Sequence, residues 1–110
     1  MAELPVFLGN NKIFDANTMT STLTSATQDI AEAGGYCSHS IFTGTPTGTL
    51  TVEASNDGVN FSIVHTLALT GSAGQDLYNA DKPHYRYVRV KYTFSSGTGS
   101  LTTYFSSKRI

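Results

Sequence analysis

The clearest alternations of apolar and polar residues in this chain have a period of two, which is typical of strands with one buried face. Residues 49–54 place an apolar side chain at every second position, and residues 36–43 and 101–106 alternate in the same way. The longest candidate strand opens at Pro83 and continues to about residue 94. These faces predict one buried core that contains Leu50, Val52, Val88, Val90 and Leu101.

Turn residues separate the candidate strands at regular intervals. Gly-rich or Pro-containing stretches occupy residues 44–48, 71–74 and 95–99. Asp57-Gly58 predicts a tight hairpin turn with positive φ at Gly58, which joins the strand at Leu50 to a return strand with Phe61 and Ile63. Seven or eight short strands spaced like this predict an all-β fold, a single antiparallel β-sandwich of the jelly-roll-like kind, over residues 18–110.

The N-terminal residues 1–17 do not share this pattern. A short strand is predicted at residues 4–8, and Gly9-Asn10-Asn11 has the composition of a turn. The segment is either an extended arm or an edge strand. Leu4, Val6 and Phe7 have no place in the alternating core, so we expect them to contact a neighbouring subunit or to close the chain's own sheet.

Length and charge restrict the classes of function. The chain has 110 residues, which suits one domain, and its net charge is −1 with seven Lys and Arg. This charge argues against a nucleic-acid partner. No apolar run is long enough to predict a membrane span or a secretory signal. Cys37 is the only cysteine, so no intrachain disulfide forms, and we expect synthesis in a reducing cytoplasm.

Catalytic and metal-binding patterns are not found in the sequence. The histidines His39, His65 and His84 lack a metal-ligand spacing, and Gly-x-Ser-x-Gly does not occur. A lone cysteine such as Cys37 on a strand face is expected to be a small packed residue. Asp57 with its neighbouring Asn residues resembles part of a calcium loop, but a hairpin turn closed by its own side chains is the favoured interpretation. We therefore predict no enzyme activity, no cofactor and no metal.

One polar stripe is a candidate for a partner surface. Tyr85, Tyr87, Arg89 and Lys91 fall on the same side of the longest predicted strand. Tyr and Arg are frequent in interface hot spots, although long side chains on a sheet face also simply cover their neighbours. The candidate interface residues are Leu4, Val6, Phe7, Tyr85, Tyr87 and Arg89.

Two segments resemble the paired signatures of discoidin-type jelly rolls, which bind sugars or lipids. They are SNDGVNF at residues 55–61 and YRYVRV at residues 85–90. The spacing between them is shorter here, and Phe61 stands where a tryptophan often follows the turn. The resemblance therefore implies a sandwich topology more than a ligand site.

A second resemblance covers residues 18–108. TSTLTS at residues 20–25, the strand at 36–43, GTLTVEASNDG at 48–58, the aromatic strand at 85–92 and GTGSL at 97–101 occur in an order that resembles small virion proteins of bacteriophages. This resemblance implies a non-enzymatic subunit of the head shell or a capsid decoration. Such a protein is made in the host cytoplasm, resides in the virion, and binds itself as a homo-oligomer and other virion proteins.

The alternative function is a carbohydrate-binding module that attaches its carrier to a glycan surface. Sugar sites usually present exposed aromatic rings as stacking platforms, and the chain has no tryptophan. Tyr36, Tyr78 and Tyr104 are the rings that would take this role.

Overall fold

A computed structural model describes residues 6–31, 33–81 and 83–109, without placing the side chains of residues 6–10 and 109. None of these residues lies in a helix, so the described part holds no helix long and apolar enough to cross a membrane. The strands are β1 (Val6–Thr18), β2 (Leu23–Thr24), β3 (Gln28–Asp29), β4 (Gly35–Gly44), β5 (Thr47–Ser55), β6 (Ser62–Thr70), β7 (Gly74–Asp81), β8 (Tyr87–Ser96) and β9 (Gly99–Arg109).

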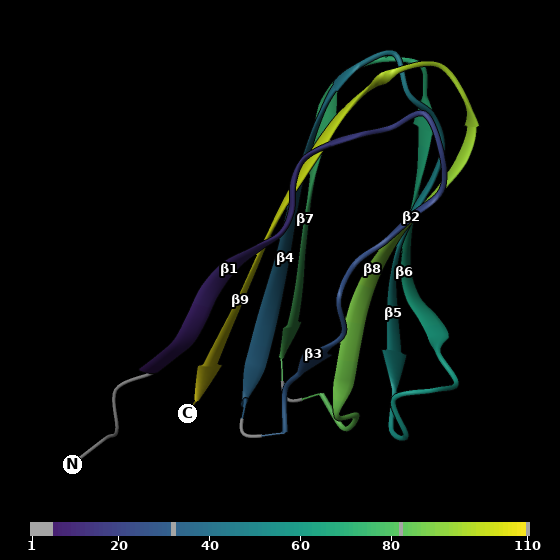
Figure 1. Ribbon diagram of the computed structural model, residues 1–110. Helices are drawn as coiled ribbons and strands as arrows, with labels where there is room; N and C mark the ends of the chain where they lie inside the picture. The colour runs from purple at the N-terminus through teal and green to yellow at the C-terminus, as the bar shows by residue number, and fades with distance from the viewer. Residues whose placement is uncertain (1–5, 32, 82, 110) are drawn as a thin grey trace.

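The strands form two antiparallel sheets that pack face to face (Figure 1). One sheet has the order β1-β9-β4-β7, and the other has the order β2-β8-β5-β6 with β3 also paired to β8. The β5–β6 hairpin stays within one sheet, whereas the connections on either side of it cross between sheets. The prediction of an antiparallel β-sandwich is confirmed.

The core lies between the inner faces of the two sheets. Val88, Val90 and Leu101 are fully buried, and Leu50 and Val52 are 2% exposed, so the five predicted core residues are confirmed. The strand pairing puts Leu50 opposite Tyr92 and Val52 opposite Val90, which gives a continuous apolar inner face on β5 and β8. Burying each such side chain contributes about 1.5–3 kcal/mol to folding.

Small hydroxyl residues occupy part of the inner face of the other sheet. Ser38, Ser40 and Thr103 are buried, and the Ser40 and Thr103 hydroxyls form a hydrogen bond of 2.9 Å. Their small volume leaves room for the Tyr36 ring, which stacks on Phe105 at 5.5 Å between centroids. β4 alternates as predicted, but the expectation that Cys37 packs in the core is wrong, because the buried face is the one with Tyr36 and Phe42. Half of the buried positions on this face are polar.

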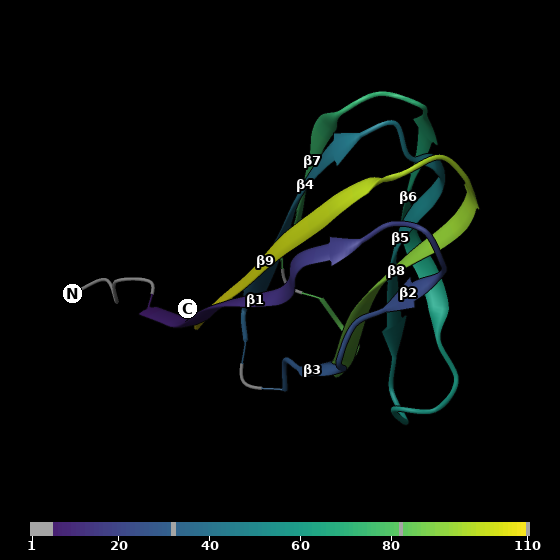
Figure 2. The same ribbon diagram turned by 45° about the horizontal axis from the view of Figure 1, so that its top comes forward.

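β1 differs from its sequence prediction. The turn expected at Gly9-Asn10-Asn11 is wrong, because β1 runs through it and pairs with β9. A register shift between Phe7 and Gly9 replaces the turn. Both views place β1 along β9 at the edge of its sheet (Figures 1 and 2).

Strand boundaries near the hairpin also differ. Gly58 has φ of +75°, as predicted, but the loop is wider than a two-residue turn, since Ala54 pairs with Ser62. Phe61 therefore precedes β6 instead of lying within it. The strand predicted to open at Pro83 is β8, which begins at Tyr87 instead, and β7 was not predicted at all.

Candidate functional site

The polar stripe predicted along Tyr85, Tyr87, Arg89 and Lys91 does not begin at Tyr85, because β8 starts at Tyr87. Tyr87 and Arg89 lie on the outer face of this strand, where they pair with Ser55 and Glu53 of β5. Tyr85 precedes the strand, packs against the hydrophobic core, and shares a hydrogen bond of 2.7 Å with the Tyr36 hydroxyl. The structure therefore brings Tyr87 and Arg89 together on one surface and does not add Tyr85 to it.

Arg89 is held by two neighbours. Its Nε donates to a Glu53 carboxylate oxygen at 2.7 Å, and its guanidinium lies 3.9 Å from the centroid of the Phe61 ring. Glu53 is only 8% exposed although it faces outward, because β5 is flanked by β6 and β8 and Arg89 covers it. This pairing of a nearly buried carboxylate with a stacked guanidinium fixes the loop before β6 onto the sheet.

A second charged pair lies beside it. Arg86 donates to both carboxylate oxygens of Asp29, at 3.3 and 3.0 Å, and its guanidinium lies 5.1 Å from the Tyr87 ring centroid. Hydrogen bonding from Arg86, and then from the backbone of Ala31, lowers the pKa of Asp29. In both pairs the arginine is matched by a carboxylate, so these two guanidinium groups are not left for an anionic ligand.

The N-terminal candidate interface residues lie partly outside the described part of the chain. Leu4 precedes the described residues, and nothing describes the side chains of Val6 and Phe7. Their backbones pair with Arg109 and Lys108 of β9, within the chain's own sheet. What these side chains contact stays a prediction.

The Asp57 carboxylate organises its own loop. Its Oδ1 accepts from the backbone N–H groups of Val59 and Asn60 at 2.8 Å and from the Ser55 hydroxyl at 2.8 Å. Its Oδ2 accepts from the Asn60 amide at 2.8 Å. These bonds, the backbone ones first, lower the pKa of Asp57. Its oxygens serve the turn, and no group of three or more His, Cys, Asp or Glu suited to a metal occurs among the described residues.

The remaining reactive side chains have structural roles. Partial burial raises the pKa of the Cys37 thiol, which disfavours the thiolate form. His39 Nε2 shares a hydrogen bond of 2.9 Å with Gln75 on the outer face of its sheet. His65 stacks on Tyr78 at 4.6 Å and bonds Asp76 at 2.8 Å, which links β6 to β7 across the two sheets.

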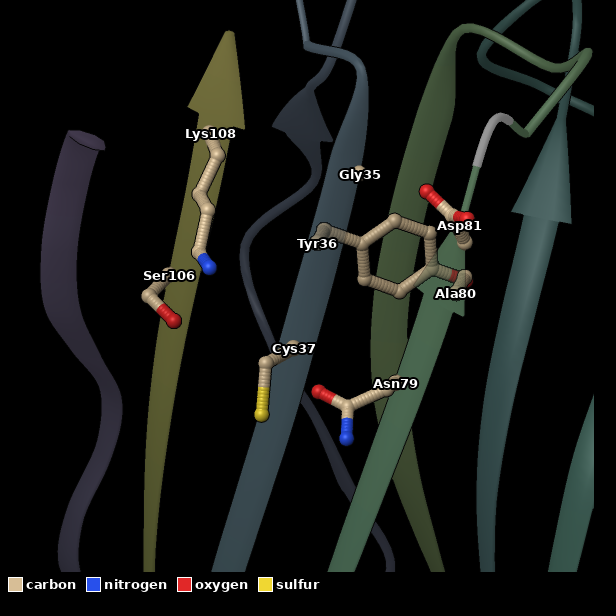
Figure 3. Close-up of a pocket in the computed structure, with 8 residues that line it drawn as sticks. All are labelled: Gly35, Tyr36, Cys37, Asn79, Ala80, Asp81, Ser106 and Lys108. Atoms are coloured by element: carbon tan, nitrogen blue, oxygen red, sulfur yellow. The ribbon is translucent and has the colours of Figure 1, made fainter. Parts of the chain in front are cut away.

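A small pocket lies where β9, β4 and β7 run side by side (Figure 3). Its volume is about 210 Å³. Gly35 pairs with Asp81 on one side and with Lys108 on the other, so the pocket lies between an acidic and a basic residue. The lining consists of Gly35, Tyr36, Cys37, Asn79, Ala80, Asp81, Ser106 and Lys108.

The pocket offers hydrogen-bonding groups without an activated nucleophile. The amide of Asn79, the hydroxyl of Ser106 and the charged groups of Asp81 and Lys108 surround it (Figure 3). Sequence reasoning missed it because β7 was not predicted. The glycine at the start of the β4 alternation was the available signal.

Two of the three tyrosine rings predicted as platforms for sugar stacking are covered by other side chains. Tyr36 is 3% exposed, and burial followed by hydrogen bonding to Tyr85 raises its pKa. Tyr78 is partly buried beneath His65. Tyr104 lies on the outer face of β9, with the Lys12 ammonium 5.6 Å from its ring centroid. The rings named for stacking therefore do not form one platform.

The fold is similar to that of several solved structures, while no family model and no curated protein matches the chain. The crystal structure of the SPBc2 prophage-derived protein YomS superposes with a TM-score of 0.65 at 9% identity, covering 97% of this chain and 98% of that one. The structure of Bacillus endospore appendages, described as a family of disulfide-linked pili, gives 0.55 at 16% identity, with 98% and 93% covered.

Two larger proteins contain the same fold in part. The PBSX exported protein XepA gives a TM-score of 0.60 at 12% identity, and infectious bursal disease virus, Gx strain, gives 0.57 at 12% identity. The chain spans only 36% and 32% of these two chains. At such identities the likeness establishes the fold: this chain has the β-sandwich found in phage-derived and viral proteins and in a pilus subunit.

Proposed function

We propose that this chain is a non-enzymatic structural subunit of a bacteriophage virion, placed in the head shell or as a capsid decoration. The observation that supports this most is the match to YomS along nearly the whole of both chains. If β2 and β3 are two parts of one strand, the sheet orders are also those of a jelly roll, an architecture common in viral capsids. The virion is then the site of action.

The side chains support a building unit over a catalyst. Burial raises the pKa of the Cys37 thiol, the Asp57 carboxylate accepts hydrogen bonds from its own loop, and Arg89 is paired with Glu53. Catalysis requires groups that converge on a reacting atom with matched protonation states. These groups instead stabilise the sandwich and its surface.

Assembly with itself and with other virion proteins is the second part of the proposal. Two contact surfaces are proposed. One is the outer surface around Tyr87 and Arg89, and the other consists of the apolar N-terminal residues Leu4, Val6 and Phe7. Tyr85 contributes by holding the chain that leads into β8, through its bond to Tyr36. Deletion of residues 1–11 should leave a folded domain with a smaller oligomer in light scattering. Loss of folding would assign these residues to the chain's own sheet alone.

Copy number in purified particles tests the virion role. A structural subunit should sediment with particles at a fixed number per particle and remain bound at high salt. A host-interacting or regulatory protein would be substoichiometric or would wash away. Quantitative mass spectrometry of gradient-purified particles measures this number directly.

The carbohydrate-binding module stays the alternative. It would use the Gly35 pocket with Tyr104, since Tyr36 and Tyr78 are covered. A glycan array with the isolated domain separates the two functions, because strong, saturable binding to one glycan class would favour attachment over assembly.

A further inference from the structure

The outer edge of β6 has no partner strand among the described residues. β6 is the last strand of its sheet and pairs with β5 on its other side (Figure 1). It is nine residues long, and its sequence SIVHTLALT contains no charged residue and no proline. Strands of this kind present a row of backbone donors and acceptors that pair readily with another strand.

Apolar side chains gather at this edge. Val59, Ile63 and Val64 are 77%, 59% and 36% exposed and lie in β6 or in the loop before it. Leu77 on β7 is the other large apolar side chain exposed among the described residues. An exposed apolar patch on a small protein usually marks a contact surface.

The other edges of the sandwich carry more protection than β6. β1 has three register shifts and the charged residues Lys12 and Asp15. β7 carries Asp76 and Asp81, while β2 and β3 have two residues each. β6 has a single register shift, at the Val52–Glu53 step of β5, and then pairs regularly from His65 to Thr70. Irregular, short or charged edges resist strand addition, so β6 is the edge open to it.

We propose that β6 of one chain pairs antiparallel with β6 of a second copy, so that the two sheets join into one. This inference rests on the proposed self-assembly and adds a contact to the two surfaces proposed above. A second copy fits because an uncharged strand paired with itself places no like charges opposite each other. A two-fold contact also needs only one self-complementary surface.

The inward side of β6 is anchored to the sandwich, while Thr66 at the middle of the strand is exposed. His65 anchors β6 to β7 through its bond to Asp76 and its stacking on Tyr78, both directed into the sandwich. Full overlap of the nine residues places Thr66 opposite the same residue of the second copy. Thr66 is exposed and pairs with Thr51 of β5, so a longer side chain there does not enter the core.

The test uses opposite charges at Thr66. Thr66→Lys and Thr66→Glu each place like charges across the contact and should weaken self-association at least tenfold in sedimentation velocity. An equimolar mixture of the two should regain wild-type association, since the charges are then opposite. Thr93→Lys is the matched control, because it adds the same charge at an exposed threonine on β8, where β5 pairs alongside. It should associate as wild type does.

Other outcomes overturn the proposal. Wild-type association in Thr66→Lys, or failure of the mixture to recover, excludes β6 self-pairing. Monomeric wild-type protein at millimolar concentration excludes it as well. None of these results would show that the protein is absent from the particle. The copy-number measurement therefore tests the virion role independently of the β6 contact.

Discussion

Replacing Leu101 by alanine tests the packing of the two sheets. Leu101 is fully buried on β9, where it pairs with Phe42 of β4. The substitution removes three carbons, worth about 2.4 kcal/mol at about 0.8 kcal/mol per buried methylene. The residual cavity adds to this, because neighbouring strands relax only partly. We expect a loss of about 3–4 kcal/mol, against about 5–15 kcal/mol for the stability of a typical domain.

Leu77→Ala is the matched control for this substitution. Leu77 is 59% exposed on the outer face of β7, so the same truncation there should cost less than about 1 kcal/mol. Urea denaturation followed by tyrosine fluorescence or circular dichroism measures both, at one protein concentration because association adds to apparent stability. Equal losses in the two variants would refute the assignment of inner and outer faces.

Four further substitutions test individual features. Val90→Asp puts a carboxylate at a fully buried position and should prevent folding, whereas an unchanged melting curve would mean that the strand faces are wrong. Gly58→Val should lower the free energy of unfolding by about 1–2 kcal/mol, because φ is +75° there, although the nearest atom, in the Tyr87 ring, is 3.5 Å from the added Cβ. Gly97→Ala should lower it more, because φ is +87° and the added Cβ would also overlap the Thr45 carbonyl. Asp57, whose pKa is lowered, stabilises the fold above its ordinary pKa of 3.8 and loses this contribution as the pH falls toward the lowered value, so acid titration should destabilise the wild type more than Asp57→Asn.

The central strands were predictable because burial imposes a local pattern. Residues 49–54 and 88–92 alternate strictly, and their apolar positions form the core. A period of two needs no knowledge of the rest of the chain. The same argument found the alternation of β4 but not its inner face, because two of the four buried positions are serines.

β7 could not be found in this way. Its inward positions are Asp76, Tyr78 and Ala80, which pair with Ser40, Ser38 and Tyr36. Asp76 is tolerated there because His65 bonds it from the opposite sheet. A polar inward residue that is satisfied by a distant partner leaves no local apolar signal.

The position of Tyr85 and the Gly35 pocket could not be predicted from the sequence, because both depend on where strands begin and how they pair. The alternating pattern of β8, extended back to Tyr85, predicts that Tyr85 lies on the outer face. The strand begins only at Tyr87, however, and Tyr85 packs against the core. The Gly35 pocket depends on the pairing of β4 with both β7 and β9. Such pairing between distant segments is set by tertiary packing, and single-strand patterns do not contain it.

Electron microscopy of particles that carry a labelled copy of this protein tests the virion role most directly. The account predicts that the label occupies a regular, symmetry-related set of positions on every particle, with neighbouring copies in contact. Labels that are absent from purified particles, or that attach at random positions and variable number, would contradict it.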